Sequence, residues 1–390
     1  MSSIIITTAL STYNITIPDS TLQTIGQSDN ILNTLNNKLS SEGNSTIIAD
    51  DVISISIIDD ININTGFTFS KYKNLTSISL PANLTSIGNQ LFLNCSNLSS
   101  ITLPTNLTSI GNEAFINCIN LTSITLPNNL TSIGTGAFYY TGLTSITIPS
   151  NVTSIGNDVF MWCFNLTSIT LPTNLTSINN NTFFGCHELS SITLPNNLIS
   201  IGSFAFDSSG LTSITIPSNV TSIDSDAFIR CVNLRSITLP TNLTSINNNT
   251  FNGCHELSSI TLPNNLISIG MYAFRECHKL SSITLPNNLI SIGVYAFDST
   301  GLTSLTIPSN VTSIDYKCFL NTPNLTNIYF EDSSLNNIII NNDIIDQNKN
   351  VTIHLNMTKA QLLALDATQN NIRKYHKFIT EYDPSLIISD

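Results

Sequence analysis

The sequence predicts a repeat solenoid, a chain coiled into stacked units with a parallel β-sheet along one side. Proline returns every 22 or 23 residues between Pro81 and Pro308. A short apolar–polar alternation precedes each of these prolines, and a phenylalanine follows each one at a nearly fixed distance. Because no unit of this length can bury its own apolar face, neighbouring units must stack to build a shared core.

Each unit opens with a strand. In a typical unit, Ile101 and Leu103 alternate with hydroxyl residues, which is the pattern of a strand with one buried face. Pro104 ends this strand, because proline lacks the N–H group that a sheet requires. After this corner, Leu107 and Ile110 form a second inward-facing pair.

The turn of each unit carries two further fixed positions. Gly111 has equivalents in the other units that are only Gly, Asn or Asp. Since these residues tolerate positive φ, we predict a left-handed turn at this position. The second position is Phe115, whose equivalents run from Phe92 to Phe319. We expect these rings to stack in a buried column.

These residues together resemble a known repeat. The pattern L-x-x-I-x-L-P-x-x-L-x-x-I-G-x-x-A-F-x-x-C is similar to the BspA-like (Treponema pallidum type) leucine-rich repeat. The resemblance implies a right-handed, curved solenoid with a parallel sheet on its concave face and short strands, turns and 3-10 or helical pieces on its convex face. It also implies a role in adhesion or protein–protein binding, and it places relatives on bacterial and protist surfaces and in large DNA viruses of protists.

The chain divides into three parts. Residues 52–330 hold about 12 to 13 repeat units of 22–23 residues. Residues 1–51 are expected to be an N-terminal cap or irregular segment, with a short helix near 31–39. Residues 331–390 are expected to be a C-terminal cap, with a strand at 351–355 and a helix after it. Caps are needed because the open ends of a solenoid expose core and strand edges.

Composition excludes several classes of function. The net charge is −12 and only 10% of residues are charged, which disfavours nucleic acid and anionic membranes as partners. No stretch approaches the roughly 18 apolar residues of a membrane-spanning helix. The N-terminus has no basic leader, so we expect a cytoplasmic location by default, with surface or virion association left open. No nucleophile motif, phosphate loop or dinucleotide fingerprint occurs, so we expect neither an enzyme nor a cofactor.

Seven of the eight cysteines share one position of the unit. They are Cys95, Cys118, Cys163, Cys186, Cys231, Cys254 and Cys277. We expect small buried thiols there, because free cysteine is among the most buried residue types. The alternative is a disulfide between neighbouring units, at Cys95 and Cys118 or at Cys163 and Cys186.

Histidines and sequon asparagines are two further candidates for sites. Cys254, His255, Cys277 and His278 form the one plausible soft-metal cluster, but adjacent residues of an extended segment point to opposite faces, so no metal site is expected. N-x-[ST] sequons such as the one at Asn97 recur in nearly every unit. We expect these asparagines to bond to the backbone of neighbouring units rather than to carry glycans.

Two sets of residues are candidates for binding. Hydroxyl residues on the predicted sheet face form two parallel rows: Ser100, Thr102, Ser123, Thr125, Ser145, Thr147, Ser168, Thr170, Ser191, Thr193, Ser213, Thr215, Ser236 and Thr238. Aromatic residues at variable positions of the units are Tyr139, Tyr140, Trp162, Phe164 and Tyr272. Tyrosine and tryptophan are enriched at the energetic centres of interfaces.

The sequence therefore favours a non-enzymatic scaffold that presents a Ser/Thr/Asn-rich face to a protein partner. The alternative is a self-associating component of a larger assembly, such as a giant-virus particle or a protist surface layer. A remote alternative is ice binding, because the paired hydroxyl rows resemble the T-x-T arrays of ice-binding solenoids. Nucleic acid and membrane insertion are not expected under any of the three.

Overall fold

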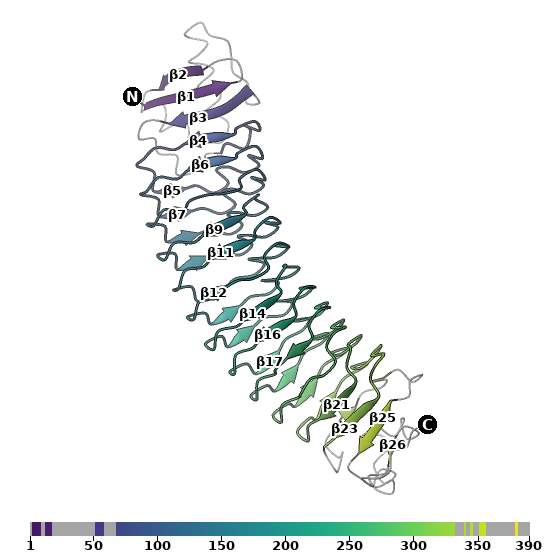
Figure 1. The fold of residues 1–390 in the computed structure, drawn as a ribbon. Coiled ribbons are helices and arrows are strands. Elements are labelled where there is room, and N and C mark those ends of the chain that lie inside the picture. The colour runs from purple at the N-terminus through teal and green to yellow at the C-terminus, as the bar shows by residue number, and fades with distance from the viewer. Residues whose placement is uncertain are drawn as a thin grey trace. The chain divides into compact units, whose positions relative to one another are not determined.

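The computed structural model describes residues 2–8, 12–17, 51–57, 68–331, 339–340, 344–345, 351–355 and 379–380. These residues form a parallel β-solenoid built from short strands and turns, with no α-helix in the described ranges (Figure 1). The chain divides into two compact units, Met1–Leu198 and Ile199–Asp390. From here on, "unit" means one of these two parts, and a single repeat of 22 or 23 residues is called a coil. The helices predicted near 31–39 and after residue 357 lie outside the described residues.

In the first unit, two rows of strands run through the coils. The front row precedes the proline position and contains β3 (Val52–Ile57), β4 (Ser77–Ser79), β6 (Ser100–Thr102), β9 (Ser145–Thr147) and β11 (Ser168–Thr170). The rear row follows it and contains β5 (Ser86–Ile87), β7 (Ser109–Ile110), β8 (Ser132–Ile133), β10 (Ser154–Ile155) and β12 (Ser177–Ile178). At the N-terminal end, β1 (Ser2–Thr8) pairs antiparallel with β2 (Thr12–Ile17) and with β3, and so covers the edge of β3.

The second unit repeats this plan. Its front row contains β14 (Ser213–Thr215), β16 (Ser236–Thr238), β18 (Ser259–Ile260), β21 (Ser304–Ile307), β23 (Asn327–Phe330), β25 (Thr352–Leu355) and β26 (Ile379–Thr380). Its rear row contains β13 (Ser200–Ile201), β15 (Ser222–Ile223), β17 (Ser245–Ile246), β19 (Ser268–Ile269), β20 (Ser291–Ile292), β22 (Ser313–Ile314) and β24 (Ile339–Ile340). The strand predicted at 351–355 is therefore confirmed, as β25.

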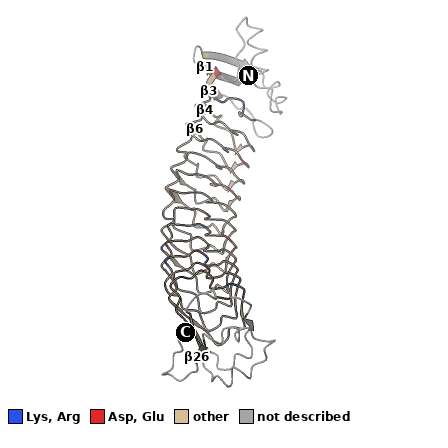
Figure 2. Cartoon of the chain, turned by 90° about the vertical axis from the view of Figure 1, so that its right-hand side faces the viewer, with Lys and Arg blue, Asp and Glu red and all other residues tan. Residues whose placement is uncertain are grey.

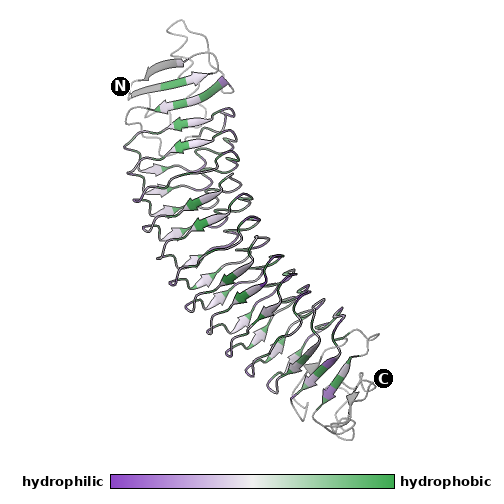
Figure 3. Ribbon diagram, viewed as in Figure 1, coloured by the Kyte–Doolittle hydropathy of each residue, from purple (hydrophilic) through white to green (hydrophobic). Residues whose placement is uncertain are grey.

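Strand pairing places like residues side by side. Ser77 of β4 pairs with Ser100 of β6, and Ile78 pairs with Ile101, in a parallel register. The pairing follows from the repeat, because a slip of one residue would turn the isoleucines outward. In Figure 3 the strands accordingly carry hydrophobic isoleucine beside the less hydrophobic serine and threonine.

The predicted phenylalanine column forms the centre of the core. Its rings are fully buried and nearly parallel. In the first unit, consecutive ring centroids lie 5.4, 5.1, 5.4, 5.7 and 5.7 Å apart from Phe69 to Phe183. The second unit has its own column from Phe206 to Phe319, with spacings of 5.2–5.8 Å. Each coil thus contributes one ring, and only stacked coils bury it.

A third row, which we call the turn row, holds the segment around each phenylalanine. Here the N–H groups of one coil donate to carbonyl groups of the next, from Gln90 to Asn112 (2.9 Å), Phe92 to Ala114 (2.8 Å) and Asn94 to Ile116 (2.9 Å). The residues on either side of the phenylalanine, such as Gln90 and Asn94, have φ of 56° and 59°. Two left-handed residues per coil therefore direct the donors of the turn row along the stack.

The prediction of a left-handed turn at Gly111 was wrong. The left-handed residues of that coil are Glu113 and Asn117, with φ of 56° and 60°. Position 111 favours glycine for a different reason, which is lack of space. A Cβ there would lie 2.6 Å from Oδ1 of Asn89. Where the same position holds Asn179, its side-chain amide donates to the carbonyl of Ile155 at 2.5 Å.

Coils of 22 residues interrupt the front row. No strand is assigned at 123–125, 191–193 or 282–284, in each case the front segment just before a 22-residue coil. The shorter coil replaces the cysteine and the two residues after it with a hydroxyl residue and glycine, as at Thr141 and Gly142. A Cβ at Gly142 would overlap the carbonyl oxygen of Ile119. The missing residue thus brings two backbones together where only glycine fits.

Candidate binding surfaces

The predicted hydroxyl rows lie on the outer side of the front segments. All of the serines and threonines named for them are exposed, whereas the isoleucines between them are buried or half-buried. Within the described ranges, the side chains of Ser100, Thr102, Ser145 and Thr147 make no hydrogen bond to another residue. The rows run along regular strands at β6, β9 and β11, but not at Ser123–Thr125 or 191–193. The surface therefore offers unused donors and acceptors on short stretches of sheet.

Other polar rows are occupied by contacts between coils. The Thr108 hydroxyl donates to the carbonyl of Thr85 (3.0 Å), and the Thr131 hydroxyl donates to that of Thr108 (2.9 Å). The sequon asparagine Asn97 donates to the carbonyl of Lys73 (2.9 Å). The predicted role of such asparagines as a ladder between coils is confirmed. These groups hold the stack together, whereas the front hydroxyls do not.

Four of the predicted aromatic residues gather on the turn row of the first unit and define what we call the aromatic patch: Tyr139, Tyr140, Trp162 and Phe164. The Tyr139 and Trp162 rings are 5.4 Å apart, and Tyr140 meets Phe164 edge to face at 5.6 Å. Tyr140, Trp162 and Phe164 are 39%, 38% and 38% exposed. Exposed rings in mutual contact form a surface of the kind found at interface centres.

Two flanking residues of this patch were not foreseen. Phe184 lies 6.3 Å from Trp162, and the His187 ring stacks on Phe164 at 5.3 Å. Both come from the coil after Trp162. Each of the two lies in the repeat that follows the predicted aromatic residue it contacts. This repeat register is the sequence signal that could have identified them.

Backbone conformation fixes the patch. Tyr140 and Trp162 have φ of 54° and 59°, in the left-handed region that bulky residues rarely adopt. Neighbouring coils place Asn117 and Gly185 at the same position, and a Cβ at Gly185 would lie 2.6 Å from Cδ1 of Trp162. Two large side chains therefore occupy positions suited to Asn or Gly, at a local cost of about 1 kcal/mol each.

Tyr272 does not belong to this patch, because it lies in the second unit. There it stacks on Tyr295 at 5.1 Å, and Tyr295 meets Tyr316 edge to face at 5.9 Å. Basic residues of the chain lie over these rings: Arg275 over Tyr272 (5.5 Å) and Lys317 over Tyr316 (4.8 Å). This tyrosine column is therefore already covered by cations.

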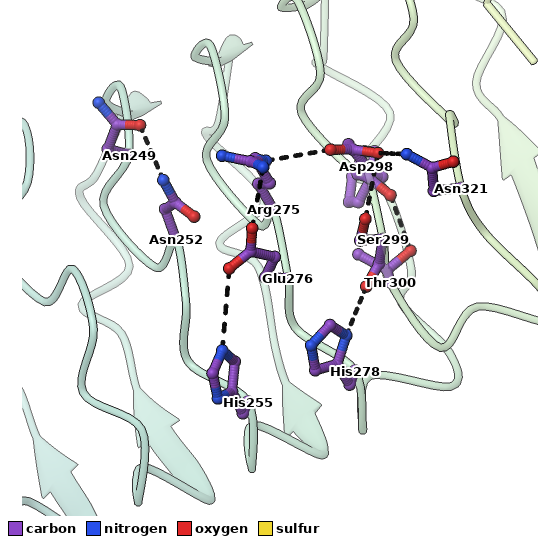
Figure 4. Close-up of polar contacts among 11 residues, drawn as sticks. Asn249, Asn252, His255, Arg275, Glu276, His278, Asp298, Ser299, Thr300 and Asn321 are labelled. Atoms are coloured by element: carbon purple, nitrogen blue, oxygen red, sulfur yellow. Dashed lines mark hydrogen bonds and ion pairs between the residues drawn. The ribbon is translucent and has the colours of Figure 1, made fainter.

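Figure 4 shows a polar network in the second unit. Arg275 Nε contacts Oδ2 of the buried Asp298 at 3.0 Å, and Arg275 Nη2 contacts Oε1 of Glu276 at 2.9 Å. His278 stacks on His255 at 4.9 Å. Among the described residues, no group of three or more His, Cys, Asp or Glu side chains is placed to hold a metal ion. The neighbouring Cys254 and Cys277 are fully buried, and their thiols donate to backbone carbonyls of the core.

The cysteine position is buried, as predicted. Each thiol donates to the carbonyl of the phenylalanine in the preceding coil, as from Cys163 to Phe138 (3.1 Å) and from Cys186 to Phe160 (3.2 Å). Burial raises the pKa of Cys163 to about 11 and that of Cys95 to about 12. In a 22-residue coil, the Thr141 hydroxyl donates to the carbonyl of Phe138 (3.0 Å) instead. These thiols are therefore core residues rather than nucleophiles.

The stacked coils, the column of buried rings and the sheet along the front define a leucine-rich repeat solenoid. The chain belongs to the family of the BspA type leucine rich repeat region, whose model matches six copies over residues 49–164, 153–257 and 244–365. No curated protein sequence matches it. Among the residues that the structure describes, none form a helix with the length and apolar character needed to cross a membrane.

The chain is similar to several solved structures, which include three bacterial proteins. The pneumococcal vaccine antigen PcpA is 19% identical, with a TM-score of 0.56 over 82% of this chain and 92% of its own. A leucine-rich repeat protein from Bacteroides ovatus is 28% identical over 72% of this chain and 82% of its own, with a TM-score of 0.49. A leucine rich cell surface protein from Faecalibacterium prausnitzii is 24% identical over 81% and 86%, with a TM-score of 0.47.

Proposed function

We propose that this protein is a non-enzymatic binding scaffold that presents the hydroxyl rows of its front segments to a protein partner. Proteins of this repeat family are commonly surface or adhesion proteins. One observation carries the proposal: the front hydroxyls are exposed and make no hydrogen bond within the described residues, whereas neighbouring polar rows are used between coils. A surface of free donors and acceptors suits recognition by many small polar contacts.

Charge has a small part in this recognition. In Figure 2 most of the described chain carries neither acidic nor basic side chains. Binding through the front rows should therefore depend little on salt, because few ion pairs are available to be screened. The partner would be selected by the spacing of hydroxyls on the strands and by the breaks at the shorter coils.

The test compares two sets of lysine variants. The first set, Thr102→Lys, Thr147→Lys and Thr170→Lys, places bulky charges on the front rows. The control set, Thr105→Lys, Asn128→Lys and Thr173→Lys, adds the same charges at exposed corner positions of the same unit. Proteins captured from the natural source by the immobilised wild type are identified, purified and titrated against both sets.

We expect the first set to weaken the identified partner at least ten-fold and the control set to leave its affinity nearly unchanged. A partner that binds both sets equally well would contradict the proposal. Sedimentation of the same variants tests self-association: oligomers abolished by the first set alone would identify the partner as a second copy. Ice binding is disfavoured by the breaks in the front row, and thermal hysteresis measured on the wild type would reveal it.

A further inference from the structure

We propose that the aromatic patch of the first unit binds cationic side chains, arginine or lysine, of a basic segment in a partner protein. This inference rests on the proposed binding role, but it concerns the turn row rather than the front hydroxyls. It assigns the patch a ligand chemistry: a positive group held over the exposed ring faces of Tyr140, Trp162 and Phe164, with the carboxylate of Asp158, near Tyr139, adding to the attraction.

The arrangement of the rings supplies the first argument. Tyr140 meets Trp162 at 80° and Phe164 at 83°, with centroids 6.3 and 5.6 Å apart. An edge-to-face contact covers at most one face of a ring, and His187 stacks on one face of Phe164, so the opposite faces are left for a ligand. The faces of aromatic rings carry negative electrostatic potential, so they attract guanidinium and ammonium groups.

The surrounding charge is the second argument. Between residues 74 and 198 the sequence contains Glu113, Asp158 and Glu188 but no lysine or arginine. Asp158 is close enough to contribute, after burial, to the raised pKa of the Tyr139 hydroxyl. Its carboxylate accepts a hydrogen bond from the Asn181 amide at 2.8 Å, which holds it in place. His187, stacked on Phe164, is a further titratable group at the patch.

The second unit displays the same contact within one chain. There, the turn-row tyrosines carry Arg275 and Lys317 over their rings. In the duplicated block, Arg230 takes the position of Trp162. Its Nε and Nη2 donate to the carboxylate of the buried Asp207 at 3.1 and 2.6 Å. The turn row thus accommodates cations, and the aromatic patch exposes rings and a carboxylate in a stretch, residues 74–198, that contains no lysine or arginine.

Rigidity is the third argument. The left-handed conformation at Tyr140 and Trp162, together with the contact between Trp162 and Gly185, limits the movement of the rings. A surface that is already ordered loses less conformational entropy on binding, which favours affinity from a small contact area.

The chain's single tryptophan, Trp162, makes the patch directly observable. The probe is a peptide containing four arginines, and its counterpart carries citrulline, which is isosteric and uncharged. We expect the arginine peptide to change the tryptophan fluorescence in a saturable way that weakens with added salt. The citrulline peptide should bind at least ten-fold more weakly.

Variants already sampled by the repeat provide matched controls. Asp158→Asn imports the residue found at Asn181, and Tyr140→Asn imports the one found at Asn117, so both should fold. Each should weaken the arginine peptide by about two- to five-fold, the effect of one cation–π or one nearby charge. Asp226→Asn removes the equivalent carboxylate in the second unit and should have no effect.

Equal binding of the two peptides, or no fluorescence change with either, would overturn the proposal. So would equal effects of Asp158→Asn and Asp226→Asn. If the arginine peptide fails while the captured partner still depends on the front hydroxyls, the patch proposal falls and the scaffold function stands. If the arginine peptide binds as expected while the captured partner does not depend on the front hydroxyls, the patch proposal stands and the role of the front rows falls.

Discussion

At the scale of single residues, the thiols of the cysteine column combine complete burial with one weak hydrogen bond to a phenylalanine carbonyl. The same slot accepts a hydroxyl in the 22-residue coils, where Ser209 lies 3.4 Å from the sulfur of Cys231 and Thr141 lies 3.2 Å from that of Cys163. The slot therefore requires a small side chain that can donate to a nearby carbonyl, and it disfavours a charged one.

Raising the pH from 8 to 10 should destabilise the protein. An unfolded thiol loses its proton near its ordinary pKa of 9.0, whereas burial raises the pKa of Cys163 to about 11 and that of Cys231 to about 12. Above pH 9 the unfolded state releases protons that the folded state retains, so stability that is complete below pH 9 is lost as the pH rises. Each thiol should contribute about 1.4 kcal/mol to this loss between pH 8 and 10.

Urea unfolding followed by far-ultraviolet circular dichroism at the two pH values measures this effect. The Cys163→Ser variant is the control, because neighbouring coils carry a hydroxyl in the same slot. At pH 8 this variant should have nearly the same urea midpoint as the wild type. Between pH 8 and 10 it should lose less stability than the wild type, by the contribution of one thiol. A midpoint that is the same at pH 8 and 10 would contradict the prediction.

At the scale of one coil, loss of a single residue has a defined structural result. The 22-residue coil that contains Gly142 interrupts the front row, and the Gly142 N–H still donates to the carbonyl of Cys118 at 3.3 Å. Its turn also contains Gly136, which has φ of 61° and room for a Cβ, since the nearest atom to an added Cβ is 3.4 Å away, at ordinary contact distance. One coil thus contains two glycines that are required to different degrees.

Replacing these two glycines should separate close packing from backbone conformation. Gly142→Ala should destabilise by roughly 3 kcal/mol, because the added Cβ collides with the backbone of the preceding coil. Gly136→Asn should cost less than about 1 kcal/mol, since Asn181 and Asn249 adopt the same left-handed conformation. Thermal unfolding of both variants measures the difference, and similar losses of stability would show that the Ile119 contact is not the cause.

At the scale of the whole chain, the sequence contains a duplicated block. Gly142 to Ser209 and Gly210 to Cys277 are near copies, and each corresponds to three coils. Substitutions between the copies fall largely on the turn row, where Trp162 becomes Arg230 and Phe164 becomes Val232. The buried phenylalanines and the front hydroxyls are kept. Duplication has thus preserved the scaffold while changing the chemistry of one row.

Deleting residues 142–209 should give a folded protein that is three coils shorter. The deletion joins Thr141 to Gly210 and recreates the natural sequence TGLTSITIPSN. Because each coil contacts chiefly its neighbours, stability should fall by a nearest-neighbour increment rather than collapse. Deleting residues 142–198, which joins two different points of the coil, should prevent cooperative unfolding; a folded product from this deletion would argue against the repeat register. Circular dichroism and urea titration provide the readout.

Much of this architecture could be predicted from the sequence because the repeat makes each signal recur. The strands, the Phe115 column and the buried Cys118 position follow from periodicity alone. The left-handed residues Glu113 and Asn117 could not be predicted, since side chains of many types occupy those positions and only hydrogen bonding to the next coil selects their backbone conformation. The contact between Phe184 and Trp162 could not be predicted either, because the sequence does not show which side chains of the turn row face outward.

The hydrogen bonds of the turn row give this row an electrical direction. Successive donors such as Phe92 and Phe115 all address the next higher coil, at 2.8 Å in both cases, so their peptide dipoles add instead of cancelling. Along this row, the carbonyl groups point toward lower-numbered coils and the N–H groups point toward higher-numbered coils. A further coil, from duplication or from a second molecule, can therefore extend the row only head to tail.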